Sequence, residues 1–173
     1  MVSMQDYDAV AVKAARAFLI ELIHVLGEYR DHVVVVGGWV PALILSNPPV
    51  EHVASTDVDL ALNFQKISNT GYQSIVKTLE QSGYYQKEDK QLYQWFKKVT
   101  IEGHEPVEVQ IDLIAGEYEG RGKGHRTQHV QDARARKARG CDLSFDDPKE
   151  IVVDGELPGG VSPRNILSAL NRN

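Results

Sequence analysis

Two aspartates close together in the chain have the spacing of a metal-binding pair. Asp57 and Asp59 are two residues apart in the segment 56–64, where apolar and polar residues alternate. Side chains two apart on a β-strand point to the same face, so both carboxylates can reach one cation. Mg²⁺ prefers a few carboxylates together with phosphate oxygens and water. A solvated strand face would carry the same pair, and that interpretation stays open for the pair alone.

A third aspartate strengthens the metal-binding interpretation. Asp112 lies on the polar face of a second alternating segment, 107–114, between the apolar residues Ile111 and Leu113. Carboxylates on neighbouring strands repel one another unless a cation neutralises them. We therefore predict that Asp57, Asp59 and Asp112 are catalytic ligands of two Mg²⁺ ions in a phosphoryl-transfer site.

A glycine pair precedes the aspartates and has the geometry of a phosphate-binding turn. Gly37 and Gly38 follow the valine run 33–36 and come directly before a predicted helix. Glycine lets a phosphate approach the backbone closely, and the N–H groups of a helix start point toward it. Glycine pairs after strands are common, so this signal alone favours an ordinary turn.

The hydrophobic pattern predicts alternating helices and strands that position these residues. The valine-rich strand has no polar face, which indicates burial on both sides. Gly83 is predicted to end a helix. Expected helices cover residues 6–30, 39–46, 69–82 and 129–139, with a last one from Pro163. Expected strands cover residues 32–36, 56–64, 92–101, 107–114 and 151–153, and the third and fourth of these form a hairpin.

Composition limits the class of protein. The chain has 173 residues, 42% hydrophobic and 25% charged, which predicts one globular domain. The net charge of −5 argues against a protein that coats nucleic acid or membranes. One cysteine, Cys141, excludes an internal disulfide framework. Because the first residues are polar and the longest apolar run, 33–45, is shorter than the roughly 20 residues of a membrane span, we expect a cytoplasmic protein without membrane contacts.

Positive charge is concentrated in one segment, 121–139, which holds seven of the lysines and arginines and one acid. Arg121, Lys123 and Arg126 are predicted to bind a nucleoside triphosphate or the backbone of an RNA acceptor. A solvated loop and helix face is the alternative for this segment.

The order of these motifs resembles the DNA-polymerase-beta-type nucleotidyltransferase superfamily. The resemblance rests on Gly37-Gly38, a short helix, residues 55–60 with the Asp pair, and residues 109–114 with the third Asp. Within that superfamily the chain is similar to predicted nucleotidyltransferases grouped with abortive-infection toxins of bacterial toxin–antitoxin systems. The resemblance implies an α+β fold, a small mixed β-sheet with helices packed against it.

The same resemblance assigns roles to individual residues. Gly37 and Gly38 match the glycines under the triphosphate, and the Asp57–Asp59 pair matches the metal ligands. Asp112 matches the third carboxylate, which helps to activate the attacking hydroxyl. Hydroxyl groups that could touch phosphate precede the pair, on Ser55 and Thr56. Many relatives carry Arg or Lys shortly before the Asp pair, where this chain has residues 51–54 without either.

The expected activity is transfer of a nucleoside monophosphate from a nucleoside triphosphate, such as ATP, to a hydroxyl group. The acceptor would be an RNA end, a protein or a small molecule, and the expected partner is a cognate antitoxin. The expected domain comprises a catalytic core, 33–116, the basic segment 121–139, and a short extension, 142–173. The alternative is a truncated or non-catalytic binding module with the same fold.

Overall fold

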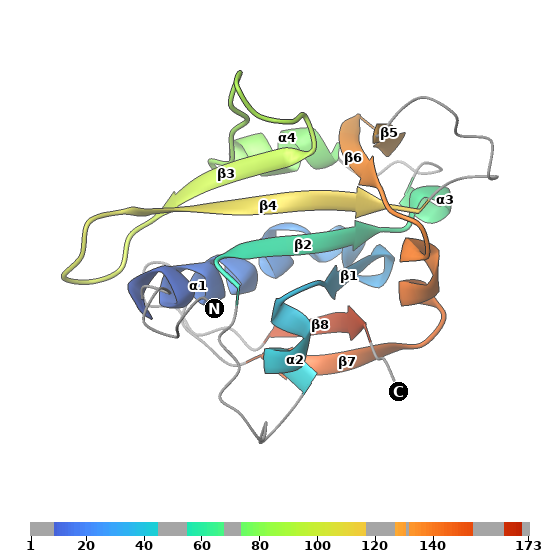
Figure 1. The fold of residues 1–173 in the computed structure, drawn as a ribbon, viewed down its shortest axis with the longest axis horizontal. Coiled ribbons are helices and arrows are strands. Elements are labelled where there is room, and N and C mark those ends of the chain that lie inside the picture. Colours follow the sequence, from blue (N-terminus) through green and yellow to red (C-terminus); the bar gives the residue numbers. More distant parts are fainter. Residues whose placement is uncertain are drawn as a thin grey trace, which may run out of the picture.

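An eight-stranded mixed β-sheet forms the centre of the computed structural model (Figure 1). The structure describes residues 9–44, 55–67, 74–116, 127–130, 132–153 and 165–170. The strands are β1 (Val33–Val36), β2 (Asp57–Leu62), β3 (Gln94–Val99), β4 (Val107–Ala115), β5 (Thr127–Val130), β6 (Ala133–Lys137), β7 (Pro148–Val153) and β8 (Asn165–Leu170). Their order across the sheet is β5-β6-β4-β2-β1-β8-β7, and β3 pairs with β4 outside this path.

Strand β4 has two partners along one of its edges. Antiparallel β3 pairs with its first part, up to the register pair Gln94–Asp112. Parallel β6 pairs with its last two residues, beginning at the register pair Ile114–Arg136. The sheet therefore divides directly after Asp112, and three strands meet there.

Helices cover both faces of the sheet. The helices are α1 (Ala9–Val25), α2 (Trp39–Ile44), α3 (Phe64–Ile67) and α4 (Ile75–Gln81), with 3₁₀ segments η2 (Gly27–His32) and η4 (Cys141–Phe145). In Figure 1 the long helix α1 lies behind the strands, and α2 lies in front of them. The face away from α1 is thus covered only in part by regular structure of the described residues.

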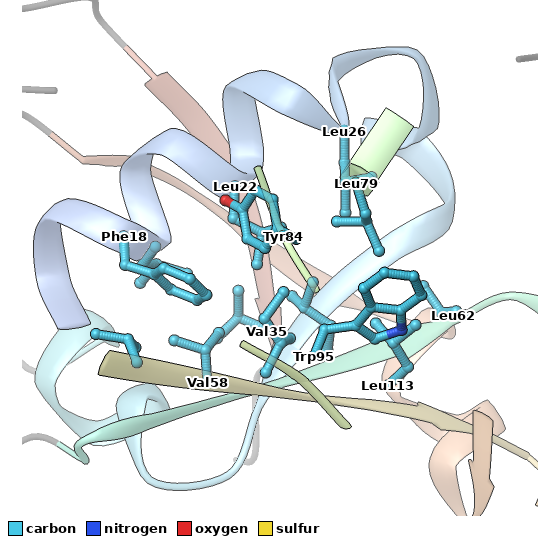
Figure 2. Packing of buried hydrophobic residues seen from close by; sticks show 14 of the residues in the cluster. Phe18, Leu22, Leu26, Val35, Val58, Leu62, Leu79, Tyr84, Trp95 and Leu113 are labelled. Carbon is cyan, nitrogen blue, oxygen red and sulfur yellow. The ribbon is translucent and has the colours of Figure 1, made fainter. Parts of the chain in front are cut away.

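The main hydrophobic core lies between α1 and the sheet. Phe18 and Leu22 of α1 point toward Val58 and Val35 of the central strands, with Trp95 of β3 beside them (Figure 2). All five side chains are at least 98% buried. Since burial of one such side chain contributes about 1.5–3 kcal/mol, this cluster fixes which face of each strand points inward.

A smaller cluster lies on the opposite face of the sheet, away from α1. It contains Val34, Ala61, Ile114 and Cys141. Because Val34 belongs to this cluster and Val35 to the main core, β1 is buried on both faces, as its run of valines predicted. The predicted hairpin of residues 92–101 and 107–114 is also confirmed, as β3 and β4.

Two predicted helices are wrong. The described residues of the helix predicted over 129–139 lie mostly in the antiparallel strands β5 and β6 instead, because Ala133 and Ala135 alternate with arginines and are buried in the main core. Residues 165–170, expected in a helix from Pro163, form strand β8. That strand pairs with β1 and with an extended β7, and so satisfies backbone groups of a strand that would otherwise be an edge.

At the level of fold class, the mixed α/β architecture is confirmed: a curled mixed sheet with helices packed on it. The sheet is larger than predicted because β5, β6 and β8 add three strands to the five expected, and β7 is longer than the strand expected over residues 151–153. Helix α4 ends as predicted, since Gly83 adopts a φ of +82° and its N–H donates to the Glu80 carbonyl at 3.0 Å.

The start of α4 gives a stability prediction. The Ser74 side chain caps the helix by accepting from the Lys77 N–H at 3.1 Å, and it donates to Asp132, which also accepts from the Val76 N–H. We expect Ser74→Ala to lower the free energy of unfolding by about 1 kcal/mol in a urea titration. Ser82→Ala, at the other end of α4, should change it less; an equal loss in both variants would contradict a capping role.

Candidate active site

The three predicted aspartates lie on one face of two neighbouring strands. β2 and β4 are parallel partners, and their register places Asp59 directly beside Asp112 and Asp57 beside Gln110. The intervening residues Val58 and Ile111 are buried in the main core, so the four polar side chains point away from α1. We call this the carboxylate face. Neighbouring strands are about 4.8 Å apart, so the carboxylates of Asp59 and Asp112 are adjacent.

Each carboxylate also has a hydrogen-bonding or ionic partner from the protein. Asp57 accepts from the Ser55 hydroxyl. Asp112 accepts from the side-chain amides of Gln110, at 2.7 Å, and Gln94, at 3.3 Å. Two amide donors on one oxygen hold the Asp112 side chain in place while its second oxygen keeps its acceptor capacity.

An arginine on β6, the parallel neighbour of β4, reaches the same face. Arg136 of β6 places a guanidinium nitrogen 3.8 Å from an Asp59 oxygen. Its guanidinium carbon lies 6.0 Å from the centre of the Tyr93 ring. This position follows from the division of the sheet, because β6 takes over the edge of β4 just after Asp112.

The electrostatics of the carboxylate face favour binding of a cation. The pKa of Asp59 is raised from 3.8 to about 6, first by burial and then by repulsion from Asp57 and Asp112, while Arg136 acts in the opposite direction. One guanidinium therefore does not compensate the repulsion among three carboxylates. A divalent cation would, and oxygen ligands of this kind are those that Mg²⁺ takes.

The described side chains are not gathered around a preformed metal position. Within the described ranges, no three or more His, Cys, Asp or Glu side chains form a group that could hold a metal ion. Asp57, Asp59 and Asp112 point instead to Ser55, Arg136 and the two glutamines. The donor chemistry fits Mg²⁺, but binding requires these carboxylates to exchange protein partners for the ion.

The two glycines pack directly against the aspartate strand. Gly37 has a φ of +74°, and a Cβ added to it would come 3.1 Å from Asp59 Cγ and still closer to a carboxylate oxygen. A Cβ on Gly38 would come 2.9 Å from Ser55 Cβ. The turn after β1 therefore needs glycine to approach this part of the site.

The structure thus brings together most of the residues predicted from sequence. Gly37, Gly38, Ser55 and the three aspartates lie at neighbouring positions, and Thr56 is exposed beside them. The remaining predicted binding residues, Arg121, Lys123 and Arg126, lie outside the described residues.

Sequence reasoning missed three side chains at this site: Arg136, Gln94 and Gln110. The signal for Arg136 was the alternation of Ala and Arg over residues 133–136, which has the period of a strand rather than a helix. Gln110 stands on the polar face of the same alternating segment as Asp112. Only the register of β3 against β4 shows that Gln94 reaches Asp112.

Comparisons with protein-family models, with curated proteins and with solved structures give no match to this chain. Across the described residues, no helix is both long and apolar enough to cross a membrane.

Proposed function

We propose that the protein is a metal-dependent nucleotidyltransferase that moves a nucleoside monophosphate from a nucleoside triphosphate to a hydroxyl acceptor. The observation that carries this proposal is the register pairing of Asp59 with Asp112 on parallel strands, with Asp57 on the same face. The close packing of Gly37 against Asp59 supports the proposal. A triphosphate bound to the three carboxylates through metal ions would lie beside Gly37, which has no side chain to obstruct it.

In this proposal Asp57, Asp59 and Asp112 hold Mg²⁺, which when bound neutralises phosphate charge and lowers the pKa of the attacking hydroxyl. Asp112 is positioned by Gln94 and Gln110 to take the proton from that hydroxyl. The hydroxyl oxygen forms a bond to the α-phosphorus, the bond between the α-phosphorus and the bridging oxygen breaks, and pyrophosphate leaves.

Arg136 has a separate role in the proposal. Its guanidinium faces the carboxylates and is 44% exposed, so it can form hydrogen bonds with phosphate oxygens of a bound triphosphate. It would thereby stabilise the negative charge of the departing pyrophosphate. The acceptor class and an antitoxin partner are proposals that rest on the resemblance alone.

The test is a transfer assay with matched variants of β4. The protein is incubated with Mg²⁺, each of the four α-labelled nucleoside triphosphates, and total RNA or cell lysate. We expect label in a macromolecular product, and a loss of about 100-fold or more in Asp112→Asn. Glu108→Gln is the control, because Glu108 lies on the same strand but pairs with Lys87 and Tyr85 away from the site.

Two results would contradict the proposal. One is equal label transfer by the wild type and Asp112→Asn. The other is the absence of both label transfer and Mg²⁺-dependent nucleotide binding in the wild type, which would leave a binding module without this chemistry.

A further inference from the structure

A cavity of about 510 Å³ lies on the same side of the sheet as the carboxylate face. Its walls come from β1, α2, the end of β4 and the segment that leads into η4. Apolar side chains dominate its lining, among them Val36, Val40, Ile44, Ile114, Ala138 and Cys141. Its volume is within the range of about 300–1,000 Å³ typical of small-molecule sites. We call it the apolar cavity.

The apolar cavity borders the proposed metal site. Gly37 lines the cavity and also packs against Asp59. Val36, another lining residue, is the register partner of Asp59 on the neighbouring strand. Ile114 lies two residues after Asp112 on the same face of β4 and is the register partner of Arg136. One ligand can therefore reach from the carboxylates into the cavity.

The lining selects for an uncharged group. The described lining residues include no carboxylate, and Arg139 is the one charged residue among them. Burial raises the pKa of the Cys141 thiol to about 11, so this side chain is neutral at physiological pH. A charged phosphate would gain little from these apolar walls, whereas a flat heteroaromatic ring would bury its faces against them.

We propose that the apolar cavity binds the base and ribose of the nucleotide whose phosphates lie at Asp57, Asp59 and Asp112. This inference rests on the proposed function, since it assigns the other half of the same substrate. The cavity then determines how much more tightly a complete nucleotide binds than its phosphate chain alone. The carboxylate face binds the part that is common to all nucleoside triphosphates.

The test compares binding of each of the four nucleoside triphosphates with binding of inorganic triphosphate, both with Mg²⁺, by calorimetry. Ala138→Leu adds volume inside the cavity, and Ala42→Leu makes the same change on an exposed position of α2. We expect Ala138→Leu to weaken the best nucleotide by about 10-fold or more and to leave inorganic triphosphate unchanged. Ala42→Leu should alter neither affinity.

Three outcomes would overturn the inference in distinguishable ways. If Ala138→Leu weakens both ligands equally, or neither, the cavity does not hold the base. If the wild type binds inorganic triphosphate as tightly as every nucleotide, no base site exists. If neither ligand binds the wild type with Mg²⁺, the proposed function itself fails, and the inference fails with it.

Cys141 gives a second readout that does not depend on a variant. It is the one cysteine of the chain and lines the cavity. We expect a bound nucleotide to slow alkylation of Cys141 by iodoacetamide at alkaline pH by several fold, and inorganic triphosphate with Mg²⁺ to leave the rate unchanged. Equal protection by both ligands, or by neither, would contradict occupation of the cavity by the base.

Discussion

Asp59→Asn should make the metal-free protein more stable and, at the same time, lower nucleotidyl transfer by about 100-fold or more. The pKa of Asp59 is raised from 3.8 to about 6, chiefly because the carboxyl is buried and lies beside Asp57 and Asp112. Ionised Asp59 therefore destabilises the folded protein relative to the unfolded chain. At neutral pH it lowers the free energy of unfolding by about 1–3 kcal/mol, and the neutral amide of Asn removes this effect.

The sign of the pH dependence follows from the raised pKa. Below about pH 4 Asp59 is protonated in both the folded and the unfolded chain, so the charge costs nothing. As the pH rises from there to about 6, the unfolded chain loses the proton first and the folded state loses stability. The stability advantage of Asp59→Asn should grow over this interval and stay constant above it.

Urea titrations in EDTA over this pH range measure the effect. Glu108→Gln is a control of opposite sign, because Lys87 and Tyr85 lower the pKa of Glu108 by hydrogen bonding, so that removal of this charge should not stabilise the protein. Mg²⁺ should stabilise the wild type more than Asp59→Asn. If Asp59→Asn is less stable than the wild type in EDTA above pH 6, the ionised carboxylate of Asp59 does not destabilise the folded protein.

The sequence alone predicts which face of each strand carries the site, but not which strands are neighbours. Alternation in residues 56–64 and 107–114 places the aspartates opposite the buried residues Val58 and Ile111, and the structure agrees. Alternation contains no information on pairing. β2 pairs with β4 in parallel because β3, which lies between them in the chain, pairs with the opposite edge of β4.

The parts of the fold that were mispredicted depend on long-range contacts. Residues 165–170 form a strand because the free edge of β1, which is distant in sequence, and the preceding strand β7 provide backbone partners. The hairpin of β5 and β6 has a local signal in its alternating alanines, but its high positive charge also fits the exposed face of a helix. The helix prediction therefore missed Arg136, which reaches Asp59 because β6 pairs with the last residues of β4.

Gly37→Ala should reduce both stability and Mg²⁺-dependent transfer, and a second glycine separates the two causes. Gly37 and Gly103 have nearly the same backbone conformation, with φ of +74° and +79°, so alanine at either position costs about 1 kcal/mol of strain. A Cβ at Gly103 meets no atom within 4 Å, whereas at Gly37 it collides with the Asp59 carboxylate. Gly37→Ala must therefore displace a proposed metal ligand. We expect the affinity of Gly37→Ala for Mg²⁺ and nucleotide to fall by about 10-fold or more, while Gly103→Ala binds as the wild type does.

Calorimetric titration of both variants, alongside their urea unfolding curves, measures this difference. Equal binding by the two variants would mean that the position of the Asp59 carboxylate does not matter for the bound cation, and would remove Gly37 from the proposed site.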